Sequence, residues 1–218
     1  QLRATNNTFR KYNSNYEFES ILKLMNSLIN KDSTEEVYLQ VSELANYVMS
    51  TEVMQAMIAV IFVHGHKNCP TIEDCRKFVT RLWFSPKDWT SYDYGVTSLL
   101  FSQNDWKLNK SPHWISFINH NNTLQDFSNL KMDEIFARNG NERTLLGIQV
   151  SFSENATFKP KTMFWGTTLQ TELALYTLCY VFKTCKFDIL GNQVGVKLSV
   201  SKSQGKYAMI EKVKINFV

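Results

Sequence analysis

The stretch that decides the fold is residues 159–185, which read KPKTMFWGTTLQTELALYTLCYVFKTC. Gly166 supplies a turn after a short apolar run, and either Thr167 or Thr168 can cap the helix that follows. Thr167 and Gln170 also have the spacing of a capping box. The helix is apolar on most of its faces, which predicts that it is buried in a core.

The first part of the chain has the periodicity of four helices. Apolar side chains recur at helical spacing over residues 16–29. Asp32 or Ser33 can cap a second helix, a third runs over about residues 51–63, and a fourth begins near Thr71. The third is apolar on nearly every side, so we expect it to be central in a helical layer.

After Pro86 the pattern changes to β-rich segments separated by Gly, Asn and Ser clusters. The expected strands are residues 92–102, 114–119, 144–153, 157–165, 194–200 and 207–217. Helices followed by strands predict an α+β fold. The polar residues 1–15 predict a loose N-terminal segment. Residues 16–218 predict one domain, with a helical part over 16–85 and a β-rich part over 86–218.

Composition excludes some classes of protein. The 218 residues are 44% hydrophobic and 13% aromatic, which excludes a disordered chain. The formal charge of +4 is too small to indicate nucleic-acid binding by itself. No apolar run is long enough to predict a membrane span. Four Asn-x-Ser/Thr sequons favour a secreted, extracellular glycoprotein; they begin at Asn6, Asn109, Asn121 and Asn155.

The four cysteines form two pairs with a separation of six residues: Cys69 with Cys75, and Cys179 with Cys185. Two local disulfides are the preferred interpretation; four cysteines allow three connectivities, and free buried thiols are the alternative. Neither spacing is that of a zinc site. His64 and His66 have no carboxylate or cysteine following at ligand spacing, so they are interpreted as helix-end histidines and no metal site is predicted.

The segment GTTLQTELALYTLC resembles the closing helix of the EndoU family of poly(U)-specific endoribonucleases, whose signature is G-T-S-P-E-F-E-x-A-L-Y-T-L-C. The matching residues are Gly166, Thr167, Glu172, Ala174, Leu175, Tyr176, Thr177, Leu178 and Cys179. Residues 168–171 replace the Ser-Pro-Glu-Phe centre. Residues 44–84 resemble the family's helical N-terminal part. The resemblance implies a helical N-terminal layer packed on two antiparallel β-sheets of EndoU type.

The same resemblance implies a chemistry. The family cleaves RNA after uridylates, leaves a 2′,3′-cyclic phosphate, and is often stimulated by manganese. Two imidazoles act as general base and acid, and a lysine stabilises the charge on the phosphorane. The lysine position falls on Lys159, with Lys161 as a competing candidate, and Thr162 matches the small hydroxyl residue that precedes the apolar strand.

The chain departs from the family at its acid-base groups. Tyr94 occupies the place of the first histidine, with Asp93 standing for the preceding glutamate, and a phenol is a poor base at neutral pH. SPHWISF resembles the family's H-N-W-I-Q-F, but His113 falls in the asparagine position. A slip of one residue on a strand would turn its side chain to the other face. The family's C-terminal tyrosine has no equivalent, and Tyr207 matches only an earlier one.

These departures lead to two hypotheses. The first is a secreted EndoU-fold protein with impaired catalysis that acts by binding single-stranded RNA or a protein. The alternative is an active uridylate-preferring endoribonuclease that uses His113 or His120 with Lys159, with Asp93 or Tyr94 completing the set and manganese as its one candidate cofactor. RNA would be contacted by Lys107, Lys110 and Lys161, because cations near aromatic side chains suit phosphates and stacked bases.

Overall fold

The computed structural model describes residues 16–30, 32–88, 92–100, 113–115, 130–139, 142–154, 157–189, 192–203 and 207–217. Six helices lie in these residues: α2 (Tyr16–Asn30), α3 (Thr34–Ser50), α4 (Glu52–Val63), α5 (Ile72–Phe84), α6 (Gly95–Leu100) and α8 (Leu169–Phe182). The strands are β1 (Leu130–Asn139), β2 (Glu142–Glu154), β3 (Thr157–Phe164), β4 (Lys186–Ile189), β5 (Asn192–Ser203) and β6 (Tyr207–Phe217). The predicted α+β class is confirmed.

The helices of the first part begin where the sequence places their caps. Ser33 accepts a hydrogen bond from the backbone N–H of Glu36 and caps α3. Thr71 accepts one from the N–H of Asp74 and caps α5. Satisfying these N–H groups fixes where each helix starts. The apolar faces of α2, α3, α4 and α5 are buried together and form about half of the core.

The strands form two antiparallel sheets of three, in the orders β1–β2–β3 and β4–β5–β6. The strands expected over residues 144–153, 157–165, 194–200 and 207–217 are all present, within a few residues of their expected ends. Strands β1 and β4 were not expected from the sequence. Phe164 at the end of β3 packs edge-on against Phe217 at the end of β6, with 5.6 Å between ring centroids, so the two sheets meet there.

The strand expected over residues 92–102 is wrong, because residues 95–100 form helix α6. The Tyr94 N–H donates to the hydroxyl of Thr97, and the Ser98 N–H donates to the Tyr94 carbonyl, so the first turn of a helix closes instead of a ladder. A Cβ on Gly95 would lie 2.6 Å from the backbone oxygen of Leu82. Glycine therefore lets α6 begin against the end of α5.

The strand expected over residues 114–119 also differs from the structure in its described part. Trp114 and Ile115 are helical, and residues 116–119 lie outside the described residues. The strand register that governed the expectation for His113 therefore does not apply, and its orientation is set by a helical turn.

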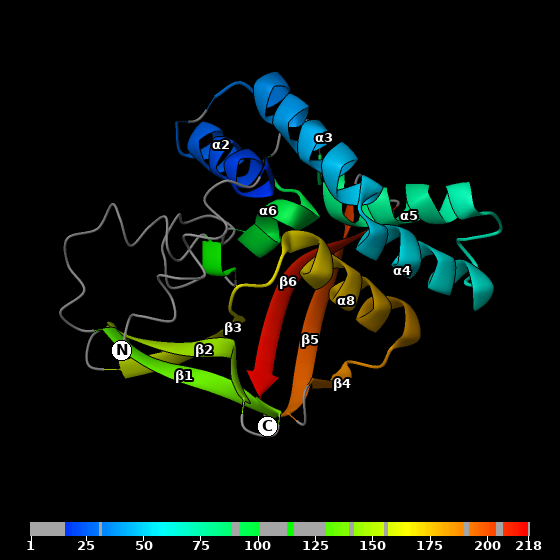
Figure 1. The fold of residues 1–218 in the computed structure, drawn as a ribbon. Helices are drawn as coiled ribbons and strands as arrows, with labels where there is room; N and C mark the ends of the chain where they lie inside the picture. The colour runs from blue at the N-terminus through cyan, green and yellow to red at the C-terminus, as the bar shows by residue number, and fades with distance from the viewer. Residues whose placement is uncertain are drawn as a thin grey trace.

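Helix α8 lies between the helical layer and the second sheet (Figure 1). It contacts α4 on one side and β5 on the other, while β6 contacts α5, α6 and β3. No single helix in the described part of the chain is both long and apolar enough to cross a membrane. Helices α3 and α4 pass the same test only as a pair, and the chain bends by 73° between them.

Candidate functional site

The start of α8 is built by a glycine and two threonines. Gly166 has φ of +72°, a conformation that glycine adopts without strain. Thr168 is the N-cap, and its hydroxyl accepts a hydrogen bond from a backbone N–H of the first turn. Thr167 donates its hydroxyl to Glu172 instead. Of the two expected caps, Thr168 is therefore the correct one, and the capping box of Thr167 with Gln170 is not formed.

Glu172, one turn into α8, is a carboxyl buried among donors. The Thr167 hydroxyl lies 2.5 Å from its Oε1, and the Tyr176 hydroxyl donates to its Oε2 at 2.8 Å. The pKa of Glu172 is raised to about 8: burial is the main cause, the two hydrogen bonds act in the opposite direction, and the nearby Glu17 adds to the increase. The carboxyl is therefore mostly protonated at neutral pH.

His113 faces this carboxyl from the segment 113–115. Its Nε2 lies 3.5 Å from Glu172 Oε1, and its Nδ1 accepts the backbone N–H of Ile115 at 3.3 Å. Because Nδ1 is an acceptor, the proton of the neutral ring is on Nε2 and points toward Glu172. Burial lowers the pKa of His113 to about 3. Since burial disfavours charge on both groups, His113 and Glu172 form a neutral pair and not a salt bridge.

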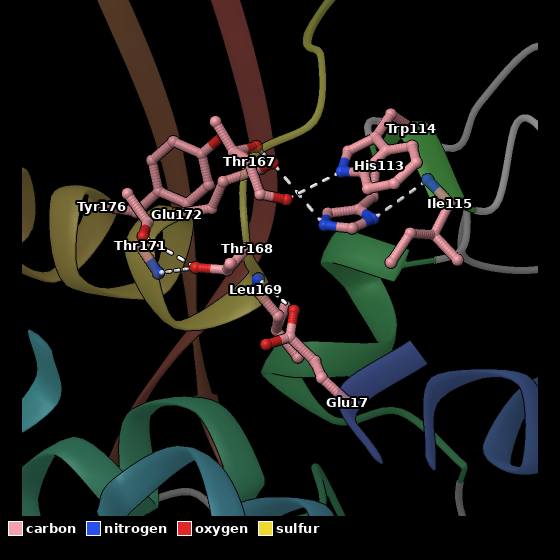
Figure 2. A network of polar contacts seen from close by, with 10 residues as sticks. All are labelled: Glu17, His113, Trp114, Ile115, Thr167, Thr168, Leu169, Thr171, Glu172 and Tyr176. Atoms are coloured by element: carbon pink, nitrogen blue, oxygen red, sulfur yellow. Dashed lines mark hydrogen bonds and ion pairs between the residues drawn. The ribbon is translucent and has the colours of Figure 1, made fainter. Parts of the chain in front are cut away.

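Two more hydrogen bonds connect this pair to distant parts of the chain. Glu17 of α2 accepts the backbone N–H of Leu169 at 2.7 Å, and the indole of Trp114 donates to the carbonyl of Thr167 at 2.8 Å. Figure 2 shows the side chains converging from α2, from the segment 113–115 and from α8. We call this group the Glu172 cluster; its members are Glu17, His113, Trp114, Thr167, Glu172 and Tyr176.

The Glu172 cluster is closed to solvent. Apart from the half-buried Thr167, its members are at most 1% exposed. A ribose hydroxyl or a phosphate has no path to His113 Nε2 or to the Glu172 carboxyl in this arrangement. The cluster therefore positions α8 against α2 and the segment 113–115, and it does not present an acid or a base to a substrate.

The other expected catalytic residues are not members of the Glu172 cluster. Tyr94 is buried beside α6, and burial raises the pKa of its phenol to about 12, which removes it as a base at neutral pH. Thr162 is half-buried in β3 and pairs with Gln149 of β2. Lys159 and Lys161 lie in the same strand, opposite Phe152 and Val150, and the positions of their side chains are outside the described structure.

Several expected residues fall outside the described residues altogether. They are the RNA-contact candidates Lys107 and Lys110, the alternative imidazole His120, and the four sequon asparagines Asn6, Asn109, Asn121 and Asn155. These remain predictions from the sequence.

The two cysteine pairs differ in whether they form a disulfide. Cys179 and Cys185 form a disulfide at the C-terminal end of α8, with their Cα atoms 4.8 Å apart, as expected. Cys69 and Cys75 are buried free thiols, so the second expected disulfide is not formed here. Within the described residues, no group of three or more His, Cys, Asp or Glu side chains is placed to hold a metal ion.

His64 and His66 lie at the end of α4, as expected. His64 is the C-cap residue of α4, and its ring packs edge-on against Phe182 of α8 with 5.2 Å between centroids. His66 lies 5.0 Å from the ring of Phe78 of α5. Burial lowers the pKa of His66, with Lys67 and Lys183 adding to the effect. The two histidines therefore contribute to packing between α4, α5 and α8.

Sequence reasoning missed the partners that bury Glu172. In the sequence, Glu172 stands out only as a match to the EndoU signature, whereas the side chain points inward to Tyr176. The available signal was a single carboxylate on an otherwise apolar helix, with a tyrosine four residues later on the same face. Glu17 gave no such signal, because its partner, the N–H of Leu169, is 152 residues away.

Comparison of the chain with known protein families, with curated proteins and with solved structures found no match.

Proposed function

We propose that this chain is a secreted, non-catalytic domain of EndoU type that acts by binding a partner protein. The burial of His113 carries the proposal. A general base must reach the proton that it removes. His113 is enclosed, its two ring nitrogens face Ile115 and Glu172, and its pKa is about 3.

The number and the positions of the histidines support the loss of catalysis. The sequence contains four histidines, and cleavage of the family's kind needs two at one phosphate. His113 is buried. His64 and His66 lie at the end of α4, on the opposite side of the molecule from β3, which carries Lys159 (Figure 1). His120 alone is left, and a single imidazole does not make an acid-base pair.

Exposed apolar side chains favour a protein partner over RNA. Val63 at the end of α4 is 79% exposed, and Phe62 and Val60 beside it are also exposed. Phe182 at the end of α8 is exposed and reaches this group through its contact with His64. We call Val60, Phe62, Val63 and Phe182 the α4–α8 corner. Apolar side chains gathered at one surface are typical of protein-interaction sites.

A disulfide and four glycosylation sequons support secretion. Disulfides persist in oxidising compartments, and Cys179 is bonded to Cys185. The four sequons are acceptors for glycans only in a secretory pathway. Both features fit an extracellular binding protein.

The alternative, an active uridylate-preferring endoribonuclease, is tested directly. Purified protein is incubated with a uridine-rich oligonucleotide, with and without manganese, beside Lys159→Ala, His120→Ala and the control Lys186→Ala on β4. We expect no cleavage by any of them. Cleavage by the unmodified protein that disappears in Lys159→Ala and His120→Ala, but not in Lys186→Ala, would refute the proposal.

The binding half of the proposal has its own test. Immobilised protein is compared with Val63→Asp for the extracellular proteins that it retains. Val53→Asp is the matched control, because Val53 is exposed at the other end of α4, about 15 Å away along the helix. We expect a protein to be retained by the unmodified chain and Val53→Asp but not by Val63→Asp. Salt-sensitive RNA binding without such a protein would favour RNA as the ligand instead.

A further inference from the structure

Two buried thiols lie in contact where α4 turns into α5. Cys69 is 2% exposed and Cys75 is fully buried. Burial, together with the neighbouring Cys75 thiol, raises the pKa of the Cys69 thiol to about 12. The two thiols are therefore neighbours inside the fold, and both are free.

The local backbone holds this contact in place. The Cys69 N–H donates to the His66 carbonyl at 2.8 Å, and the Cys75 N–H donates to the Thr71 carbonyl at 3.0 Å. The Thr71 hydroxyl also caps α5. Both cysteines are therefore held by backbone hydrogen bonds, one within the loop and the other within the first turn of the helix.

A second pair in the same chain shows what this spacing permits. Cys179 and Cys185 have the same separation of six residues, also join a helix to its adjoining loop, and are bonded. A separation of six residues between a helix and its adjoining loop is therefore compatible with a disulfide in this chain.

We propose that Cys69 and Cys75 are a thiol–disulfide exchange site, which is a dithiol in the form described here and closes to a disulfide when it meets a small disulfide oxidant such as oxidised glutathione. This site is separate from the α4–α8 corner and does not depend on the proposed binding function.

The exchange reaction needs no reactant other than oxidised glutathione. One cysteine loses its proton to solvent, and its sulfur attacks one sulfur of oxidised glutathione, so that a mixed disulfide forms and one glutathione thiolate leaves. The second cysteine loses its proton and attacks the protein sulfur of the mixed disulfide, which releases the other glutathione. Two protein thiols are oxidised, and one oxidised glutathione becomes two reduced molecules. The high pKa of Cys69 makes its thiolate scarce, so exchange is slow and waits for local opening of the loop.

Digestion with trypsin allows the bonding state of Cys69 and Cys75 to be measured separately from that of the other two cysteines. Trypsin cuts after Lys67 and Arg76, so both cysteines fall in one peptide, residues 68–76. Cys179 and Cys185 fall in two peptides, residues 162–183 and 184–186, because Lys183 lies between them. The folded, purified chain is equilibrated in glutathione buffers from fully reduced to fully oxidised, quenched in acid, alkylated and digested. Mass spectrometry then counts alkyl groups on residues 68–76.

In oxidised glutathione we expect this peptide to carry no alkyl group and to be two hydrogens lighter than the reduced peptide, and in reduced glutathione to carry two. Closure should also raise the Tm by roughly 5 °C. Cys75→Ala should give neither change. The inference is overturned if the peptide keeps two alkyl groups in oxidised glutathione even after unfolding and refolding there, or if glutathione stays attached to one cysteine and the ring does not close.

Discussion

The neutral pair of His113 and Glu172 predicts how stability depends on pH. The folded pKa of Glu172, about 8, is above the ordinary value of 4.5, so its contribution is full below pH 4.5 and is lost as pH rises toward 8. The folded pKa of His113, about 3, is below the ordinary 6.5, so its contribution is full above pH 6.5 and is lost as pH falls toward 3.

The size of the change in the free energy of unfolding follows from where the pH ranges of these two groups overlap. Between pH 4.5 and 6.5 the opposite slopes cancel, which gives a plateau. From pH 6.5 to 8 only Glu172 of the pair still titrates. At about 1.4 kcal/mol per pH unit, that interval of about 1.5 units removes about 2 kcal/mol from the free energy of unfolding. A loss of about 2 kcal/mol is expected for the same reason from pH 4.5 down to 3.

The assay is urea unfolding at half-unit intervals from pH 3 to 8.5, with Glu172→Gln as the test variant. In Glu172→Gln the fall above pH 6.5 should largely disappear, because the amide does not titrate. Burial also raises the pKa of Glu17, so the fall that remains measures the share of Glu17. Glu43→Gln, which removes an exposed carboxylate of α3, should keep the full profile of the unmodified chain.

Two results would refute the reasoning. One is a stability that stays flat or rises from pH 6.5 to 8 in the unmodified chain. The other is an equal fall in the unmodified chain and in Glu172→Gln. A nitrogen NMR spectrum checks the proton directly: at neutral pH, His113 should show a bare Nδ1 and a protonated Nε2, whereas a charged ring would show protons on both.

Two further predictions concern packing and hydrogen bonding. Gly95→Ala places a Cβ 2.6 Å from a backbone oxygen of α5, so it should cost about 3 kcal/mol of unfolding free energy in urea, whereas Gly195→Ala, whose nearest neighbour is 3.8 Å away, should change it little. Tyr176→Phe removes the hydroxyl that donates to Glu172 and should cost about 1–3 kcal/mol in the same assay. Tyr180→Phe, which alters a half-buried ring of the same helix, should cost less than about 0.5 kcal/mol, and equal losses in the two variants would contradict the hydrogen bond's role.

Local signals predicted most of the helices. The hydroxyls of Ser33 and Thr71 cap α3 and α5 as their sequence positions suggested, because a cap acts on N–H groups only two or three residues away. The helix α6 was not predicted because its six residues are all buried, so no exposed polar face marks a helical period. Gly95 serves a close approach of α6 to α5, a contact between segments that local patterns do not encode.

The site was predicted less well, for a physical reason. Interpreting residues 114–119 as a strand made the orientation of His113 a matter of alternation between two faces, whereas Trp114 and Ile115 are helical and the ring of His113 is buried in the core. The partner that encloses it, Glu172, lies 59 positions further along the chain. Periodicity within a window of 10–20 residues carries no information on such a contact.

The bonds that fasten α8 also set an order of events during synthesis. Glu17 of α2 meets Leu169 across 152 residues, and the indole of Trp83 meets the Thr177 hydroxyl across 94. At the roughly 5–20 residues per second of a ribosome, the 152 residues between Glu17 and Leu169 take roughly 8–30 s to synthesise, so α2 waits that long for its partner. Until then the faces of α3 and α4 that contact α8 in the folded chain have no partner to cover them.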